Sequence, residues 1–208
     1  MNLLKFYQNI AEFAYSGGYD EKLFSRIAHK YNLTKKITID ELTIPPLIYS
    51  FNDKKISKYY LSVSRGQNLY RLYAKNSEND GLGGTYWVYE IHLRNELPYF
   101  IVDSIFNTVG IDMIFKDFQE VDLEGDFSEY FKLYIPTNEQ VDVLSVIGPD
   151  VMEKLYLYWN EVDLIVAGKK AWLITRNGWS ADKSIELILE AGNLIAQELT
   201  HRAKSYQS

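Results

Sequence analysis

A chain of 208 residues is long enough for one sizeable hydrophobic core or two small ones. Its hydrophobic fraction of 47% and charged fraction of 24% are those of a folded protein and exclude a disordered chain. The net charge of −6 argues against general attraction to nucleic acid or to an anionic membrane. The absence of cysteine excludes disulfides, thiolate metal sites and cysteine nucleophiles.

The first ten residues carry a polar side chain every few positions and lack the apolar segment of a signal peptide. No window reaches the roughly 18 consecutive apolar residues of a membrane span. We therefore expect a cytoplasmic protein that makes no contact with a membrane.

Two helices are expected at the start of the chain. Residues 3–15 place apolar side chains at helical spacing, and Asp20 is a typical cap for a second helix that carries Leu23, Phe24 and Ile27 on one face. Pro45 and the proline after it then force an extended path. A helical segment over residues 1–44 is therefore predicted to precede a different kind of structure.

Strands are expected between the two prolines and the middle of the chain, because the apolar period changes from helical spacing to two. The segments rich in aromatic and β-branched residues are 59–63, 69–74, 85–93 and 99–102. The second and third would form a hairpin across a polar loop with glycines. Within 85–93, the predicted core face carries Trp87, Tyr89, Ile91 and Leu93.

The second half of the chain predicts a strand over 131–135 and then two short helices. Thr137 and Gln140 form a capping box that opens a helix with Val141, Leu144 and Ile147 facing inward. A second helix after Gly148 would carry Met152, Leu155 and Trp159 on one face.

A hairpin and a long helix are expected to follow. Segments 162–167 and 171–176 would pair across the Gly168-Lys169-Lys170 turn. Ser180 would cap the final helix, whose apolar stripe consists of Ile185, Ile188, Gly192, Ile195 and Leu199.

Hairpins in the middle of the chain with helices at both ends predict an α+β fold. We expect antiparallel sheet with two N-terminal helices, two short helices in the C-terminal half and a long C-terminal helix. Residues 1–208 are expected to form one domain, which could be subdivided into a helical part (1–44), a hairpin part (45–115) and a mixed part (116–208). Whether the two halves share one sheet stays open at this point.

Two segments resemble a family of uncharacterised bacterial proteins. They are Val121-Asp-Leu-Glu-Gly-Asp-Phe-Ser-Glu-Tyr-Phe-Lys-Leu-Tyr-Ile-Pro136 and Gly148-Pro-Asp-Val-Met-Glu-Lys-Leu155. The family pairs a Leu-Glu-Gly-Asp-Phe…Tyr-Phe segment with a Thr-Pro-x-x-Met helix start, and Gly148 departs from it by replacing the threonine. The resemblance covers about 117–174 and implies a bacterial protein; the family has no established activity, so it assigns no catalytic residue.

Acidic and histidine side chains offer two weak patterns of catalytic or metal chemistry. Asp122, Glu124 and Asp126 alternate, so on a strand they would share one face and could bind a divalent cation. Glu90 and His92 lie two apart on one strand face, as a metal-binding or acid–base pair would. A solvated strand face is the simpler explanation of both patterns, and no cofactor is predicted.

Charge is distributed unevenly along the chain. Residues 22–75 carry a surplus of Lys and Arg, whereas 112–163 are strongly acidic. Within the basic part, cations alternate with rings as in single-strand nucleic-acid binders, at Lys58, Tyr60, Arg65, Tyr70 and Arg71. Amphipathic strands with lysine and arginine on their solvent-exposed face give the same pattern. The negative net charge makes nucleic acid an unfavourable partner.

The final helix, about residues 180–204, is long for a globular protein, and its apolar stripe has two interpretations. The stripe either closes the core or is offered to a partner protein or a second copy of the chain. No nucleophile, base and stabiliser converge in the sequence. The leading hypothesis is therefore a non-catalytic binding module for another protein, with a carboxylate-based or metal-dependent enzyme and a nucleic-acid or phosphate binder as alternatives.

Overall fold

A computed structural model describes residues 18–36, 42, 45, 53–56, 60–64, 66–75, 84–106, 117–123, 125–137, 140–176 and 181–206. The fold is α+β, as predicted. Its strands join in one eight-stranded sheet of order β1-β3-β4-β5-β7-β6, with β2 also paired to β4 and β8 to β5. The predicted helix over 3–15 lies outside the described residues.

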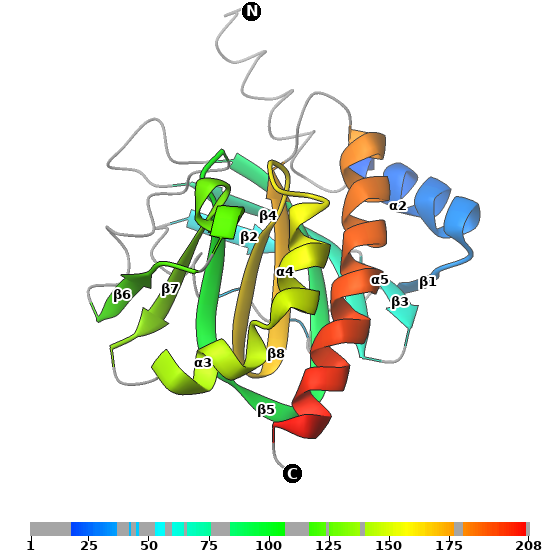
Figure 1. The fold of residues 1–208 in the computed structure, drawn as a ribbon. Coiled ribbons are helices and arrows are strands. Elements are labelled where there is room, and N and C mark those ends of the chain that lie inside the picture. Colours follow the sequence, from blue (N-terminus) through cyan, green and yellow to red (C-terminus); the bar gives the residue numbers. More distant parts are fainter. Residues whose placement is uncertain are drawn as a thin grey trace, which may run out of the picture.

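The described elements are α2 (Gly18–Tyr31), β1 (Thr34–Lys36), β2 (Asp53–Ile56), β3 (Tyr60–Ser64), β4 (Gln67–Lys75), β5 (Gly84–Ser104), β6 (Phe118–Val121), the 3-10 helix η3 (Gly125–Glu129), β7 (Phe131–Pro136), α3 (Gln140–Val146), α4 (Pro149–Tyr156), β8 (Asp163–Arg176) and α5 (Ala181–Ser205). Every strand pair is antiparallel. Figure 1 shows α3, α4 and α5 in front of the sheet. Strands from both halves of the chain therefore share one sheet.

The two longest strands correct two predictions. The segments 85–93 and 99–102 are parts of one 21-residue strand, β5. The hairpin predicted over 162–176 is also a single strand, β8, which pairs with β5 along both of its halves. The register shifts on either side of the pair Leu97–Gly168, where Gly168 has a φ of +60°. Both strands therefore bend together at a bulge instead of turning back.

The helical face of the sheet holds the larger core. The face of β5 predicted to be apolar, with Trp87, Tyr89, Ile91 and Leu93, is buried there. Helix α2 adds Leu23, Phe24 and Ile27 to the same core, and the ring of Phe24 meets Trp87 edge to face at 5.6 Å.

Helix α5 lies on β5 through its predicted stripe. Ile185, Ile188, Ile195 and Leu199 are buried. At Gly192 the helix comes so close to the sheet that an added Cβ would lie 2.5 Å from Cγ of Tyr89. The apolar stripe of α5 thus packs against the sheet, so the side chains that could have bound a partner protein are part of the core.

The two short helices are present, but their inward faces differ from the prediction. After α3, Ile147 is buried as predicted, whereas Leu144 is 40% exposed and the side chain of Val141 lies outside the described residues. Val143 and Val146, which were not predicted to face inward, are buried. Helix α4 buries Val151 and Leu155 and ends at Tyr156, so Trp159 falls in the turns beyond it. The prediction that Trp159 lies on the inward face of this helix is therefore wrong.

The second face of the sheet is buried as well, although the sequence indicated a polar face. Its cluster is rich in rings and includes Tyr60, Tyr70, Tyr86, Tyr134 and Trp172. Leu42 belongs to the same cluster, and the Glu90 side chain is fully buried within this part of β5. Four of the 17 tyrosines of the sequence are buried in this second core.

Candidate functional site

Glu90 and His92 lie together on the second face of the sheet. His92 Nε2 lies 2.6 Å from Glu90 Oε1, and Trp172 Nε1 donates to Glu90 Oε2 at 3.2 Å. Lys170 Nζ lies 3.8 Å from Oε1. Strand pairing explains the arrangement, because Glu90 is directly opposite Trp172 and His92 is directly opposite Lys170.

This cluster is a buried carboxylate covered by two partly exposed bases. The side chains of His92 and Lys170 are 34% and 26% exposed, while Glu90 is inaccessible. Because the carboxylate accepts from Nε2, the neutral imidazole carries its basic lone pair on Nδ1. Such a pair has the chemistry of a general base, but it also stabilises the sheet by neutralising a buried charge.

The acidic row does not form as predicted. Strand β6 ends at Val121, so Asp122 lies in the following loop and Asp126 in the 3-10 helix η3. Glu124 lies outside the described residues. Asp122 and Asp126 thus share no strand face, and they lie on elements other than the strand of Glu90. Among the described residues there is no group of three or more His, Asp or Glu side chains arranged to hold a metal ion.

The basic and aromatic stretch is not the predicted stacking surface. Tyr60 and Tyr70 are buried in the second core, so their rings are not accessible to bases. Arg71 is half-buried, and Lys58 and Arg65 lie outside the described residues. None of the described helices is long and apolar enough to cross a membrane.

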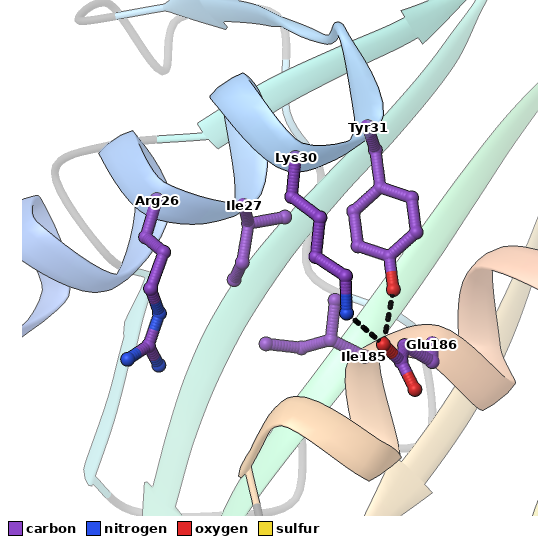
Figure 2. Close-up of a pocket in the computed structure, with 6 residues that line it drawn as sticks. All are labelled: Arg26, Ile27, Lys30, Tyr31, Ile185 and Glu186. Atoms are coloured by element: carbon purple, nitrogen blue, oxygen red, sulfur yellow. Dashed lines mark hydrogen bonds and ion pairs between the residues drawn. The ribbon is translucent and has the colours of Figure 1, made fainter.

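A shallow pocket of about 200 Å³ lies between α2 and α5, lined by Arg26, Ile27, Lys30, Tyr31, Ile185 and Glu186. Figure 2 shows Lys30 and Tyr31 converging on the Glu186 carboxylate while the Arg26 guanidinium points elsewhere. Lys30 Nζ donates to Glu186 Oε1, and the Tyr31 hydroxyl donates to the same oxygen at 2.5 Å.

The polar groups of this pocket satisfy one another. The hydrogen bond to Glu186 raises the pKa of Lys30, and the hydrogen bond from Lys30 lowers the pKa of Glu186. Burial and the bond to Glu186 raise the pKa of Tyr31. Lys30, Tyr31 and Glu186 therefore connect α2 to α5, and we call these three side chains the α2–α5 latch.

Exposed rings gather where β5, η3 and α4 end, and we call this surface the aromatic patch. Its members are Phe106, Tyr130, Tyr156, Leu157 and Trp159. Phe106 is 59% exposed, Tyr156 43% and Leu157 61%. In Figure 1, α4 passes through a turn into β8 at the top of the view, beside η3.

The four rings form a continuous chain of edge-to-face contacts. Phe106 meets Trp159 at 4.6 Å between centroids, Trp159 meets Tyr130 at 5.2 Å, and Tyr130 meets Tyr156 at 4.9 Å. The angles between these ring planes are 76°, 71° and 79°. Edge-to-face packing is the preferred arrangement of aromatic pairs, so the rings hold one another in place.

Buried hydrogen bonds also hold the three chain segments that carry these rings. The buried Ser104 donates from Oγ to the carbonyl of Trp159 at 2.5 Å and accepts from the amide of Phe106 at 3.4 Å. The amide of Ile105 donates to the carbonyl of Tyr130 at 3.1 Å, which joins the end of β5 to the segment after η3. The patch is thus preorganised by the end of the central strand.

Carboxylates lie beside the ring of Tyr130. The pKa of Tyr130 is raised, first by its hydrogen bond with Tyr156 and also by the nearby charges of Glu129 and Asp126. These two acids and Glu161, two positions after Trp159, are exposed, and they form no ion pair with a described residue. The apolar patch therefore has negative charge next to Tyr130.

This patch was not predicted from the sequence, because the helical spacing of 152–159 placed Trp159 on the inner face of a helix. A signal was present in the sequence: three aromatic residues lie within 156–159, in the most acidic part of the chain. A comparison with protein-family models, with curated proteins and with solved structures finds no match for this chain.

Proposed function

We propose that this chain is a non-catalytic module that binds another protein, and that the aromatic patch is its docking surface. The observation that carries the proposal is the exposed rings of Phe106 and Tyr156, joined by ring contacts to the half-buried Tyr130 and Trp159. The exposed Leu157 follows Tyr156 in the chain. Contiguous exposed apolar surface on a folded protein marks an interaction site more often than scattered exposed residues do.

The composition and rigidity of the patch support this proposal. Tyrosine, tryptophan and phenylalanine are enriched at the centres of protein interfaces, where they contribute most of the binding energy. The Ser104 bonds fix the carbonyl of Trp159 and the amide of Phe106, so docking costs little ordering of the backbone.

A second copy of the chain is a poor partner for this surface. In a two-fold dimer the patch would face itself, so Asp126, Glu129 and Glu161 would meet the same carboxylates of the other copy. Like charges brought together across an interface cost several kcal/mol of binding free energy, which is enough to disfavour one partner against another. The proposed partner is therefore a different protein.

The test compares variants of the whole chain as baits in extracts of the cells that make it. Trp159→Ala removes a ring from the middle of the ring chain, and Leu157→Glu puts a charge next to Tyr156 in the chain. Leu144→Glu is the matched control for Leu157→Glu, because Leu144 is exposed on α3 and is not a member of the patch. We expect both patch variants to retain at least about tenfold less partner, since a central residue contributes about 2 kcal/mol. Equal capture by all three variants, or no specific partner of the wild type, would contradict the proposal.

An acid–base enzyme is the second candidate, and the contact between Glu90 and His92 favours it. A general base must be accessible, and the partly exposed His92 ring satisfies this condition. The candidate predicts that any hydrolytic activity found in a substrate screen falls in His92→Asn and in Glu90→Gln alike. An activity that survives both substitutions would remove this candidate.

A further inference from the structure

Negative charge beside the docking surface favours a positively charged partner. Asp126 and Glu129 lie close enough to Tyr130 to raise the pKa of its hydroxyl, and Glu161 follows Trp159 by two positions. The nearest acids of α4 are already compensated, since Asp150 binds Arg202 at 2.8 Å and Glu153 binds Lys154 at 3.3 Å. The carboxylates of Asp126 and Glu129, beside the rings, and of Glu161 form no ion pair with a described residue.

The rings add a second property that favours a cation. The rings are also accessible, since Phe106 and Tyr156 are 59% and 43% exposed and Tyr130 and Trp159 are partly exposed. The electron-rich face of tryptophan or tyrosine attracts a cation within about 6 Å of the ring centre. Neighbouring planes at 71° to 79° form corners in which one cation can approach two rings.

We infer that the partner presents a basic segment whose arginine side chains stack on the rings of Tyr156 and Trp159 and pair with Asp126 and Glu129. This inference rests on the proposed function, because it names the chemistry of the partner that docks on the aromatic patch. The arginine stems and neighbouring apolar side chains of the segment cover Phe106 and Leu157.

Arginine fits this surface better than lysine does. A guanidinium is planar, so it stacks on a ring while its N–H groups bind a carboxylate at its edge. An ammonium group is a strongly hydrated point charge and gives up more hydration when it reaches the same ring. Nucleic acid is excluded from the patch by charge, because phosphates would meet exposed carboxylates.

The experiment titrates the folded chain with three terminally blocked peptides: alternating arginine and serine, the same peptide with lysine, and the same peptide with glutamine. Binding is followed by NMR at the indole N–H of Trp159 and the amide of Leu157. Asp126→Asn with Glu129→Gln removes the carboxylates. Asp117→Asn with Glu96→Gln is the matched control, which changes the net charge equally at exposed positions before β6 and at the bend of β5.

We expect the arginine peptide to shift both signals, the lysine peptide to bind more weakly and the glutamine peptide to leave both unchanged. The Asp126→Asn, Glu129→Gln variant should bind the arginine peptide about tenfold more weakly, at about threefold for each exposed charge, and the control should bind it as the wild type does. Added salt should weaken the interaction.

Three results would overturn the inference. Equal binding of the glutamine peptide would mean that the patch docks a partner without using charge, and equal binding of the lysine peptide would remove the preference for arginine. Equal weakening in the control variant would mean that only net charge matters. In each case the proposed function is decided separately by whether Leu157→Glu and Leu144→Glu baits differ.

Discussion

Replacing Gly192 with alanine should destabilise the protein, although alanine is the better helix former. Gly192 lies within α5, where the β-carbon of an alanine would lie 2.5, 2.6 and 2.7 Å from three atoms of the Tyr89 ring. Ordinary contacts between carbon atoms are about 3.5–4.0 Å, so either the helix or the ring must move by about 1 Å.

The ring of Tyr89 has little freedom to move. Its side chain is fully buried, and its hydroxyl oxygen lies within hydrogen-bond distance of two side-chain amides, 2.9 Å from Gln67 Oε1 and 2.8 Å from Asn193 Oδ1. Overpacking of a core costs up to about 3 kcal/mol, whereas replacing glycine by alanine within a helix gains about 1 kcal/mol. We therefore expect the free energy of unfolding to fall by about 2 kcal/mol.

Urea unfolding measures this change as a lower midpoint at an unchanged slope. Gln197→Ala, at an exposed position of the same helix, is the control and should change stability by less than about 0.5 kcal/mol. In a Tyr89→Leu background the cost of Gly192→Ala should shrink, because the ring that obstructs the β-carbon is gone. A single Gly192→Ala variant more stable than the wild type would refute the reasoning.

Two further predictions concern buried and paired charges. The pKa of Glu186 lies below its ordinary value of 4.5 and that of Lys30 above 10.5, so the latch stabilises the fold between these limits. In urea unfolding, the wild type should therefore be more stable than Glu186→Gln at neutral pH. This difference in the free energy of unfolding should decrease as the pH drops below about 4.5, and also at high pH as Lys30 loses its proton. A difference that does not change in acid would contradict the latch. Trp172→Phe removes the indole donor to Glu90 Oε2 and should cost about 2 kcal/mol. In a Glu90→Leu background, where no carboxylate needs the donor, the same change should cost less, and equal costs would refute a role for the bond.

Periodicity predicted the buried stripe of α5 and one core face of β5, and both were confirmed. In β5 the period of two assigned the side chains to opposite faces correctly, although the second face is buried as well. The predicted hairpin of segments 69–74 and 85–93 was confirmed as the antiparallel pair of β4 with β5. In these elements local pattern and tertiary packing agree.

Prediction failed where tertiary pairing overrides local turn chemistry. Gly168 and the two lysines after it are typical of a hairpin turn, but β8 continues through them because β5 bends at the same level. Glycine at a φ of +60° serves a bulge as readily as a turn, and the sequence does not distinguish the two.

The candidate sites were predictable only in part. Alternation along β5 brought Glu90 and His92 to one face, but it did not reveal that Glu90 is buried, since Trp172 and Lys170 come from a distant strand. The aromatic patch depends on three segments that meet only in the fold, with Phe106, Tyr130 and Trp159 contributed by different loops. Because its residues come from separate segments, such a surface gives no periodic pattern in the sequence from which it could be predicted.

The central position of β5 also bears on synthesis of the chain. Strand β5 pairs with β4 and β7 on one edge and with β8 on the other, and both of its faces are apolar. A ribosome completes β4, β5 and β7 well before β8 and α5, so the growing chain carries its longest strand with one edge and one face uncovered. Such an intermediate is prone to pair with neighbouring nascent chains. We therefore expect this protein to fold only after β8 has emerged, and to depend on chaperones until then.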